Sequence, residues 1–337
     1  MVVEGTSDMI GGKVEELYHC GRATPVRRGA VASLEHPKYV IEFIPNISDG
    51  RRADVIADLA SGLAHVPDAH LLDVSSDWSH NRSVFTMVGT RTGLEAAAHL
   101  LVERVIRAVD LRRHEGEHPR IGAIDVMPFV PLVGASMAEC VVIARAIGAH
   151  VAECFDIPVF LYEEAAVIRD RGRLEDIRRG QFEGLTEKLA DPRWAPDFGP
   201  ARRHPTAGAV AIGARHPLVA FNVNLASDDL DVARRIAAVV RERSGGLPGV
   251  KALGLRLHHR GIVQVSMNLT RPEQTSLHQA FERVRDEAAR HGAAILDSEI
   301  IGLVPRAAFV GTTPGALKLV DGHRGYVLED RLASIGA

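Results

Sequence analysis

Residues 70–89, HLLDVSSDWSHNRSVFTMVG, hold two strand-like runs, HLLDVSS and SVFTMVG, around the polar loop DWSHNR. Short apolar runs bounded by turn-forming residues indicate strands, and the short loop indicates a hairpin. The flanking sequence adds a helix and a strand on each side: YVIEFIP (39–45) and the helical stripe of 51–66 before it, the amphipathic helix 90–113 and IGAIDVMPF (121–129) after it. The resulting order, β-α-β-β-α-β, is that of the split βαβ or ferredoxin-like unit.

The last third of the chain repeats this order. It contains a strand at 217–225, a helix at 228–243, a hairpin over 251–269, a helix at 275–292 and a strand at 293–304. Between the two halves lie a helix over 136–154, a strand over 158–164 and a long irregular stretch over 165–208, of a length that is usually functional or a linker. We therefore predict an α/β (α+β) protein of two ferredoxin-like βαββαβ subdomains, each with helices on one face of a mostly antiparallel sheet. The predicted organisation is a leader at 1–36, an N-terminal subdomain at 37–213 and a C-terminal subdomain at 214–325.

Composition excludes several classes of partner. The net charge of −3 and the pI near 6.6 give no electrostatic basis for binding nucleic acid or an anionic membrane. The three cysteines, Cys20, Cys140 and Cys154, have no C-x-x-C spacing, which favours a reducing cytoplasm over a disulfide framework. We find no signal peptide and no apolar span of about 18 residues or more, so we predict a soluble protein without a membrane segment.

The stretch HEGEHPR (114–120) concentrates titratable groups before an apolar strand. It matches H-E-x-x-H, in which two histidines one helical turn apart share a metal. Gly116 and Pro119 interrupt the required helix, because the residue before a proline is driven out of the helical region. We therefore disfavour a zinc site and interpret His118 as a histidine in a loop beside Glu117 and Arg120, able to exchange protons near neutral pH.

Other polar groups have both a structural and a functional interpretation. His80, Asn81 and Arg82 lie in the hairpin loop, which is either an ordinary connection or a set of donors that face a ligand. Asparagines interrupt two apolar strands, so they are either bonded to backbone or line a polar cleft; they are Asn222, Asn224 and Asn268. Arg202, Arg203 and His204 lie between Gly/Pro turns, as a solvated surface or as a carboxylate-binding loop.

Taken together, these stretches resemble the glutamate formimidoyltransferases, or formiminotransferases. The matching pieces occur in the order of the family and cover residues 40 to 305: FIPNISDGR (43–51), LLDV (71–74), HNRSVFTMVG (80–89), RRHEGEHPRIGAIDVMPFVP (112–131), PVFLYEEAA (158–166), IRRGQFEGL (177–185), DPRWAPDFGP (191–200), HPTAGAVAIGAR (204–215), VAFNVNL (219–225) and VQVSMNL (263–269). The resemblance implies transfer of a formimidoyl group from N-formimidoyl-L-glutamate to N5 of tetrahydrofolate, a step of histidine degradation and one-carbon metabolism. It also implies a folate cleft between the two subdomains, and a homodimer.

The resemblance assigns residues by position. The catalytic histidine of the family falls on His118. Its folate-binding segment falls on Gly199, Pro200, Ala201, Arg202, Arg203, His204, Pro205, Thr206, Ala207 and Gly208. Ser75 departs from the pattern of the animal enzymes of the family, which have there an aspartate that assists the histidine. Asp77 or Asp125 is the candidate substitute.

The predicted reaction requires a group that takes a proton from the attacking nitrogen and returns one to the departing nitrogen. A histidine that titrates near neutrality does both, and no metal is required. The candidate substrate-binding residues are His80, Asn81, Arg82, Arg120, Asp125, Asn222, Asn224 and Asn268, with Arg82, Arg120 and Arg202 as candidate carboxylate anchors. Three alternatives remain open: a different formimidoyl or formyl donor, a non-catalytic folate-binding protein, and a metal-dependent hydrolase that uses His80, His114 and His118.

Overall fold

The computed structural model describes residues 40–320 and 325–336, which form two β-sheets with helices. The predicted leader at 1–36 lies outside the described residues. In the larger sheet, β4 pairs with β3 on one side and with β1 and β2 on the other, β5 pairs with β1, β2 and β7, and β6 pairs with β7. Its strands are β1 (Ile41–Phe43), β2 (Asn46–Ile47), β3 (Ala69–Asp77), β4 (Arg82–Gly89), β5 (Ile124–Pro131), β6 (Val159–Glu163) and β7 (Val210–Ala214).

The strand predicted over 39–45 is two short strands, because Pro45 separates β1 from β2. Proline has no N–H to donate to a neighbouring strand, so it interrupts the ladder. Both pieces keep the same neighbours, since each pairs antiparallel with β4 and with β5. The break therefore leaves the strand order of the predicted βαββαβ unit unchanged.

β7 is a strand that the sequence analysis did not predict. Its sequence, VAIGA, is short and three of its five residues are Ala or Gly, which are depleted in strands. β7 pairs parallel with both β5 and β6, so it extends the antiparallel part of the sheet with a parallel part. The stretch before it, residues 165–208, contains α4 (Leu174–Ile177) and α5 (Leu185–Ala190) and is less irregular than predicted.

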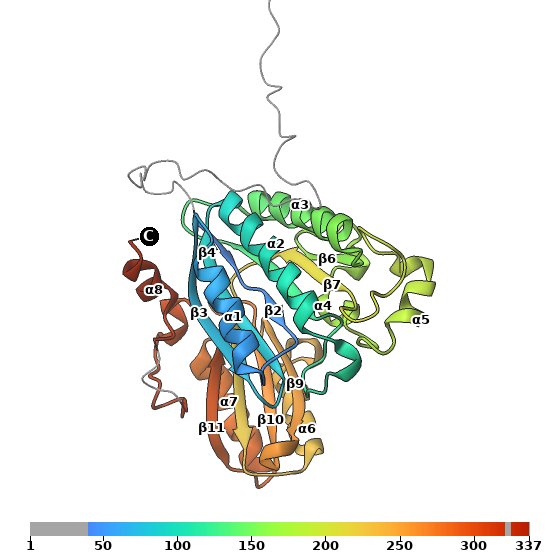
Figure 1. Cartoon of the computed structure of the whole chain (residues 1–337). Helices are drawn as coiled ribbons and strands as arrows, with labels where there is room; N and C mark the ends of the chain where they lie inside the picture. The colour runs from blue at the N-terminus through green and yellow to red at the C-terminus, as the bar shows by residue number, and fades with distance from the viewer. Residues whose placement is uncertain (1–39, 321–324, 337) are drawn as a thin grey trace, which may run out of the picture. The chain divides into compact units, whose positions relative to one another are not determined.

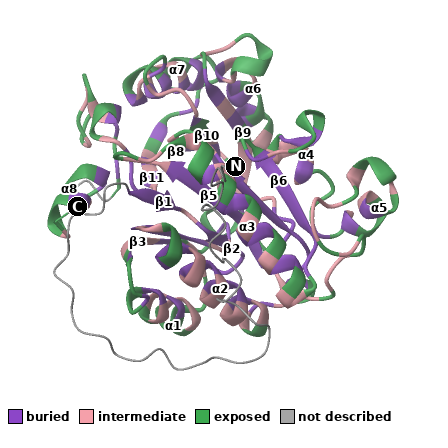
Figure 2. Ribbon diagram, turned by 90° about the horizontal axis from the view of Figure 1, so that it is seen from above, coloured by how far each residue is buried: buried purple, intermediate pink, exposed green. Residues whose placement is uncertain are grey.

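Three helices cover one face of the larger sheet (Figure 1). They are α1 (Ala53–Ala64), α2 (Arg91–Ala108) and α3 (Met137–Phe155). Their apolar sides pack on side chains such as Phe43, Phe85 and Phe129, which are fully buried. Figure 2 shows the strands in the buried colour between the helices. Because this face forms the main core, the polar side chains of the same strands are directed to the other face.

The second sheet has the strand order β11-β8-β10-β9, and every pair in it is antiparallel. Its elements are β8 (Val219–Leu225), α6 (Leu230–Val240), β9 (Val250–Leu257), β10 (Ile262–Leu269), α7 (Leu277–Arg290) and β11 (Ile295–Ile301). The helices α6 and α7 pack on its apolar face, where Phe221, Val223 and Val265 are buried. This order is consistent with a ferredoxin-like unit.

An α/β architecture with two sheets and helices is therefore confirmed, and the subdomain boundary at residue 213 stays a prediction. The last helix, α8 (Leu328–Ser334), packs through Leu328 and Leu332 on Val40 and Val88 of the larger sheet. None of the helices in residues 40–320 and 325–336 is long and apolar enough to span a membrane.

Candidate active site

The hairpin turn between β3 and β4 is held by Asn81. Asn81 has φ +47°, in the left-handed region that asparagine tolerates better than most residues. Its Oδ1 accepts from the Gly50 N–H at 2.9 Å, and its Nδ2 donates to the Glu115 carbonyl at 2.9 Å. The side chain therefore ties the hairpin to the loop before α1 and to the HEGEHPR stretch, and its predicted contact with substrate stays a prediction.

HEGEHPR is not helical. The chain leaves α2 at Ala108, forms one 3₁₀ turn over Leu111–Arg113 and continues without helix through His118. Both nitrogens of His114 have protein partners: Nδ1 accepts from Arg120 Nε at 3.1 Å and Nε2 donates to the Asn81 carbonyl at 3.0 Å. The predicted interruption of the H-E-x-x-H helix is confirmed. Within the described ranges, no three His, Cys, Asp or Glu side chains are arranged to hold a metal.

Arg120 has a structural set of partners. It is buried, and its guanidinium donates to both carboxylate oxygens of Glu183, at 2.7 and 3.0 Å, and to Gln181 Oε1 at 3.1 Å. This pair holds HEGEHPR against the segment after α4. Its role as a carboxylate anchor for substrate stays a prediction, and the occupied fork favours support of the loop.

His118 lies beside His80, with ring centroids 5.9 Å apart in an edge-to-face arrangement. Burial holds the pKa of His118 well below its ordinary value, and the charges of Arg82 and Arg178 lower it further; His80 has the same effect, and a hydrogen bond with the Pro119 backbone partly opposes them. His118 is therefore neutral at pH 7, which is the form that accepts a proton.

Two arginines act on His118 through their charge, and one of them is paired with an aspartate. Arg178 forms an ion pair with the buried Asp125, whose Oδ1 also accepts from the Ile121 N–H at 3.0 Å. Arg82 donates to Asn46 Oδ1, and burial lowers its pKa to about 10, so it stays charged at neutral pH. Nε of Arg82 and Nε of Arg178 are buried without a hydrogen-bond partner in the part of the chain that the structure describes. These positive groups give the site an affinity for anionic parts of a ligand.

His80 connects the site to the second sheet. Its side chain is 3% exposed, its Nδ1 lies 3.6 Å from Asp77 Oδ2, and its backbone N–H donates to Asp77 Oδ1 at 2.7 Å. Burial lowers the pKa of His80, while Asp77 and a hydrogen bond with Gln264 of β10 raise it. A second link joins Ser79 Oγ and His259 Nδ1, 2.8 Å apart.

The polar face of the second sheet forms one hydrogen-bonded network. Asn222 Nδ2 donates to Glu299 Oε1 at 3.0 Å, and Asn224 Nδ2 donates to Asp297 Oδ1 at 2.5 Å. Gln264 Nε2 bridges Asn224 and Glu299, at 2.9 Å from each oxygen. Both strand asparagines are satisfied by neighbouring side chains, which supports the structural alternative for them. Asn268 lies further along β10, exposed and opposite Lys251.

The segment Gly199–Gly208 lies against both ends of the HEGEHPR stretch. The Thr206 carbonyl accepts from the Leu111 N–H at 2.9 Å, and the Ala207 carbonyl accepts from the Ala123 N–H at 2.9 Å. His204 and Gly208 exchange two backbone hydrogen bonds, at 3.0 and 3.1 Å, which closes a tight turn. Arg203 stacks over the Phe182 ring, 4.2 Å from its centroid. The predicted folate segment and the predicted catalytic loop are therefore neighbours.

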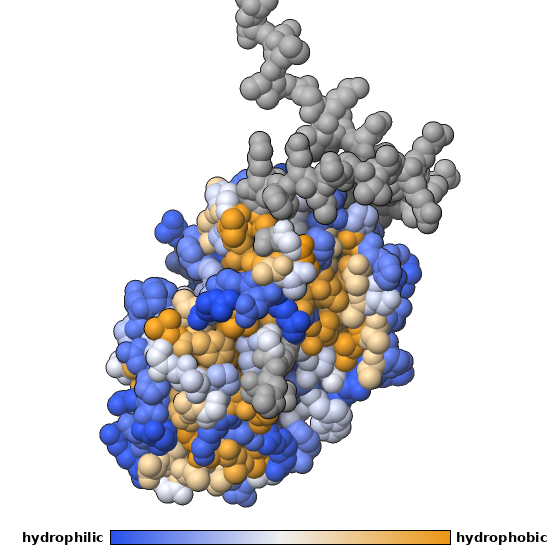
Figure 3. Space-filling model, turned by 90° about the vertical axis from the view of Figure 1, so that its left-hand side faces the viewer, coloured by the Kyte–Doolittle hydropathy of each residue, from blue (hydrophilic) through white to orange (hydrophobic). Residues whose placement is uncertain are grey.

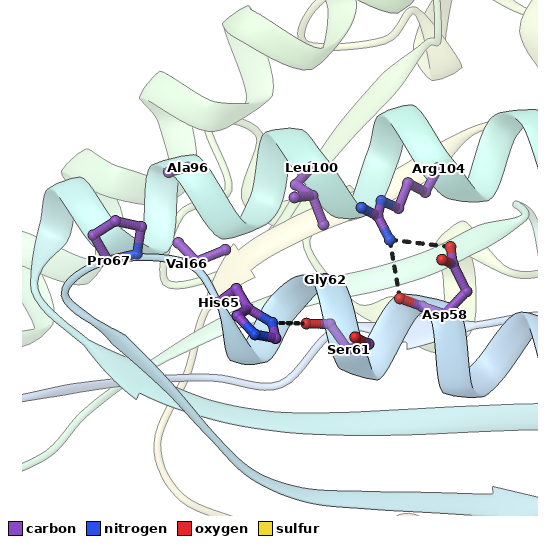
Figure 4. A pocket seen from close by; sticks show the side chains of 9 residues that line it. All are labelled: Asp58, Ser61, Gly62, His65, Val66, Pro67, Ala96, Leu100 and Arg104. Carbon is purple, nitrogen blue, oxygen red and sulfur yellow. Dashed lines mark hydrogen bonds and ion pairs between the residues drawn. The ribbon is translucent and has the colours of Figure 1, made fainter. Parts of the chain in front are cut away.

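The remaining members of that segment are more open. Ala201 and Pro205 are exposed, Pro200 is half-buried, and Arg202 pairs with Asp156 at the surface. A pocket of about 390 Å³ lies beside Arg203, lined also by Leu111, Arg112, Arg113, His114, Glu115, Phe182 and Glu183. A second pocket, of about 490 Å³, lies between α1 and α2 (Figure 4), where Arg104 pairs with Asp58 and His65 with the Ser61 carbonyl. It lies on the helix-covered side of the larger sheet, so we do not connect it with His118.

Neither candidate substitute for the acid at Ser75 is bonded to His118. Asp125 pairs with Arg178, and Asp77 faces His80. Ser75 itself donates to Asp73 Oδ2 at 2.9 Å and accepts from the Gly302 N–H at 3.2 Å. Asp125 and Asp77 therefore act on His118 through an intermediate side chain, Arg178 or His80.

Several site residues were not singled out from the sequence. Arg178, Gln181 and Glu183 occur within IRRGQFEGL, and Gln264 within VQVSMNL, so each lies in a stretch that carried the resemblance. The sequence did not show that these residues lie near the site, because Arg178 follows His118 by sixty residues and Gln264 belongs to the other sheet. Glu299 had no sequence signal beyond an acidic residue in a strand.

This arrangement, a proton-accepting histidine among arginines where two α/β sheets meet, is typical of a site for transfer chemistry on anionic small molecules. Two family models match the chain: "Formiminotransferase domain, N-terminal subdomain" over residues 40–215 and "Formiminotransferase domain" over residues 220–331. The chain belongs to the formiminotransferase family.

Similar proteins agree with this assignment. A glutamate formimidoyltransferase of Streptococcus pyogenes is 44% identical over 87% of this chain and 98% of its own length. One of Thermoplasma acidophilum is 41% identical over 87% of this chain and 97% of its own. A formimidoyltransferase-cyclodeaminase of Rattus norvegicus is 39% identical over 86% of this chain but only 54% of its own length.

Proposed function

We propose that the chain is a glutamate formimidoyltransferase, which transfers the formimidoyl group of N-formimidoyl-L-glutamate to N5 of tetrahydrofolate in histidine degradation. The observation that carries the proposal is His118, a neutral histidine among arginines in the motif GEHPR, next to the segment Gly199–Gly208. Relatives with this name match nearly their whole length. Tetrahydrofolate is a co-substrate in this reaction and no metal takes part.

The mechanism follows from the protonation state of His118. N5 of tetrahydrofolate attacks the amidine carbon, and His118 accepts the proton that N5 loses. The carbon–nitrogen bond to glutamate then breaks, and the same histidine returns the proton to the departing amine, so no proton is gained or lost overall. General acid–base catalysis of this kind contributes about 10²- to 10⁴-fold.

Positive side chains hold the substrates in line. Glutamate and the tail of folate both carry carboxylates, and Arg82 and Arg178 are the charged donors nearest His118, as their effect on its pKa indicates. Alignment of two bound reactants supplies most of the remaining acceleration. The backbone of Gly199–Gly208 supports the folate side, because it is fixed to both ends of the catalytic loop.

The test follows glutamate release from N-formimidoyl-L-glutamate in the presence and absence of tetrahydrofolate. We expect folate-dependent release that falls about 10²- to 10⁴-fold in His118→Asn, which keeps a polar amide near the place of the ring nitrogen Nδ1 but cannot titrate. His65→Asn, in the pocket between α1 and α2, is the matched histidine control and should retain wild-type turnover. Turnover of His118→Asn at the wild-type rate would remove His118 from the mechanism.

The same assay separates the alternatives. Faster transfer from N-formimidoylglycine or N-formyl-L-glutamate would identify a different donor. Binding of tetrahydrofolate without transfer from any of the three would identify a folate-binding protein. Loss of activity on chelation would favour a metal-dependent hydrolase, which the engaged nitrogens of His114 disfavour.

We also propose a cytoplasmic homodimer, on the basis of cysteine usage and the family. The face drawn in Figure 3 has hydrophobic groups interspersed with hydrophilic ones, so it does not by itself mark a contact surface. Light scattering of the purified protein tests the assembly, and a monomer at micromolar concentration would contradict it.

A further inference from the structure

We propose that His80 is a positioning residue for His118: held by Asp77, its imidazole fixes the plane of the His118 ring and controls how readily that ring takes a proton. This inference rests on the proposed function and goes beyond the folate and donor contacts assigned above. It concerns a residue of the β3–β4 turn that the sequence offered only as a candidate contact for substrate or metal.

The first argument is the placement of the His80 ring. It is almost completely buried, and its edge-to-face packing on His118, with 5.9 Å between ring centroids, leaves the two imidazoles little freedom to rotate independently. Nε2 of His80 is buried, and Gln264 of β10 is close enough to the ring to raise its pKa. Packing of this kind holds the imidazole in one place beside His118.

The second argument is the group behind His80. Asp77 Oδ2 lies 3.6 Å from Nδ1, and Asp77 Oδ1 accepts from the His80 backbone N–H at 2.7 Å, so the carboxylate fixes the residue from two directions. At 3.6 Å the Asp77 carboxylate does not hydrogen-bond Nδ1 but attracts it by charge, which favours the tautomer with a proton on Nδ1. Asp77, His80 and His118 are therefore successive neighbours, and only His118 exchanges a proton with the substrates in the proposed reaction.

The third argument is electrostatic. The groups that act on His80 are Asp77, Arg82 and, from β10, Gln264. Those that act on His118 are Arg82, Arg178 and His80. His80 is the one imidazole in the second set, and it lowers the pKa of His118, so loss of the His80 ring should make His118 easier to protonate.

Two variants test the proposal. In His80→Asn we expect kcat to fall about 10- to 100-fold with KM for both substrates changed less than about threefold, as for loss of a group that orients a ligand or catalytic side chain. Because His80 lowers the pKa of His118, its removal should also move the acid limb of the kcat–pH profile to higher pH. Asp77→Asn keeps the ring and removes its support, so it should lower kcat in the same way but by less.

A measurement without substrate separates this inference from the proposed function. The NMR titration of the His118 ring, assigned by its loss in His118→Asn, should move to a higher midpoint in His80→Asn, whatever the donor is. Circular dichroism verifies folding, and Asp77→Asn stands in if His80→Asn does not fold. If the wild-type protein is inactive in the transfer assay and the His118 midpoint still moves in His80→Asn, the proposed function is overturned but the coupling between His80 and His118 stands. An unchanged midpoint, or kcat within about twofold of wild type in both variants, would overturn the positioning role.

Discussion

At the scale of single residues, the site depends on a histidine that is kept neutral. Because burial and neighbouring arginines lower the pKa of His118, its neutral form persists below pH 6.5, and activity is lost only as pH falls through the lowered value. We expect kcat/KM to be flat from pH 8 to below 6.5 and then to decline. A pH–rate profile with limiting substrate measures kcat/KM, and one with saturating substrates measures kcat. An acid midpoint at or above pH 6.5 would contradict the lowered pKa of His118.

The ion pair between Asp125 and Arg178 is the residue-scale support of this environment. Asp125 is buried, so Asp125→Asn leaves the Arg178 charge without its partner while keeping the side-chain shape. Removal of one member of a buried pair destabilises a protein by about 3–5 kcal/mol. Urea unfolding should show this loss. The double variant Asp125→Asn with Arg178→Gln should recover part of it, and additive losses would mean that the pair does not interact.

At the scale of elements, the turn that ends the proposed folate segment depends on Gly208. Gly208 has φ +73°, and a Cβ at this position would lie 2.1 Å from the Ile121 carbonyl oxygen, on the strand side of the catalytic loop. Gly208→Ala therefore combines backbone strain with a clash against backbone. We expect loss of stability and weaker tetrahydrofolate binding, measured by thermal unfolding and by calorimetric titration.

Gly292 provides a matched control for the turn. It has φ +68° at the end of α7, but a Cβ there would meet nothing within 4 Å. Gly292→Ala should therefore show only the left-handed backbone penalty, about 1–2 kcal/mol, with unchanged folate binding. Equal losses in the two variants would mean that the contact between Gly208 and Ile121 is unimportant.

The elements also show how far the sequence predicts this protein. Helices and strands with a clear apolar period, such as α6 and β10, were predicted, because burial of one face imposes that period. β7 was missed because small residues suffice where a strand is covered on both faces. His118 was singled out from the GEHPR stretch and the family resemblance, and its catalytic role stays a prediction. The effect of Arg178 on it depends on the packing of a segment sixty residues away, which the sequence did not indicate.

At the scale of the whole molecule, each sheet packs its apolar face on its own helices and has its polar face toward the other sheet. The helices α1, α2 and α3 cover one face of the larger sheet and α6 and α7 one face of the smaller. The uncovered polar faces are joined by the His80–Gln264 and Ser79–His259 interactions. Lys251 of β9 adds ion pairs with Glu163 and Glu175, at 3.3 and 3.2 Å. Residues of both sheets therefore fix the position of His80, the neighbour of His118.

A buried carboxyl group should make the stability of the whole molecule depend on pH. Glu42 lies on β1 between Val88 and Val130, and burial raises its pKa from 4.5 to about 7, with Arg215 opposing the shift and Glu329 of α8 adding to it. Between pH 4.5 and 7 the folded protein holds a proton that the unfolded chain releases, so this group makes stability fall as pH rises through that window and then level off. The difference amounts to roughly 3 kcal/mol.

Glu42→Gln should remove this slope and raise the Tm more at pH 8 than at pH 5. Glu187→Gln, at an exposed position, should leave the slope unchanged. An equal Tm difference at both pH values would mean that Glu42 is ionised in the folded protein at pH 5, and the attraction of the Arg215 charge would then outweigh the burial of Glu42.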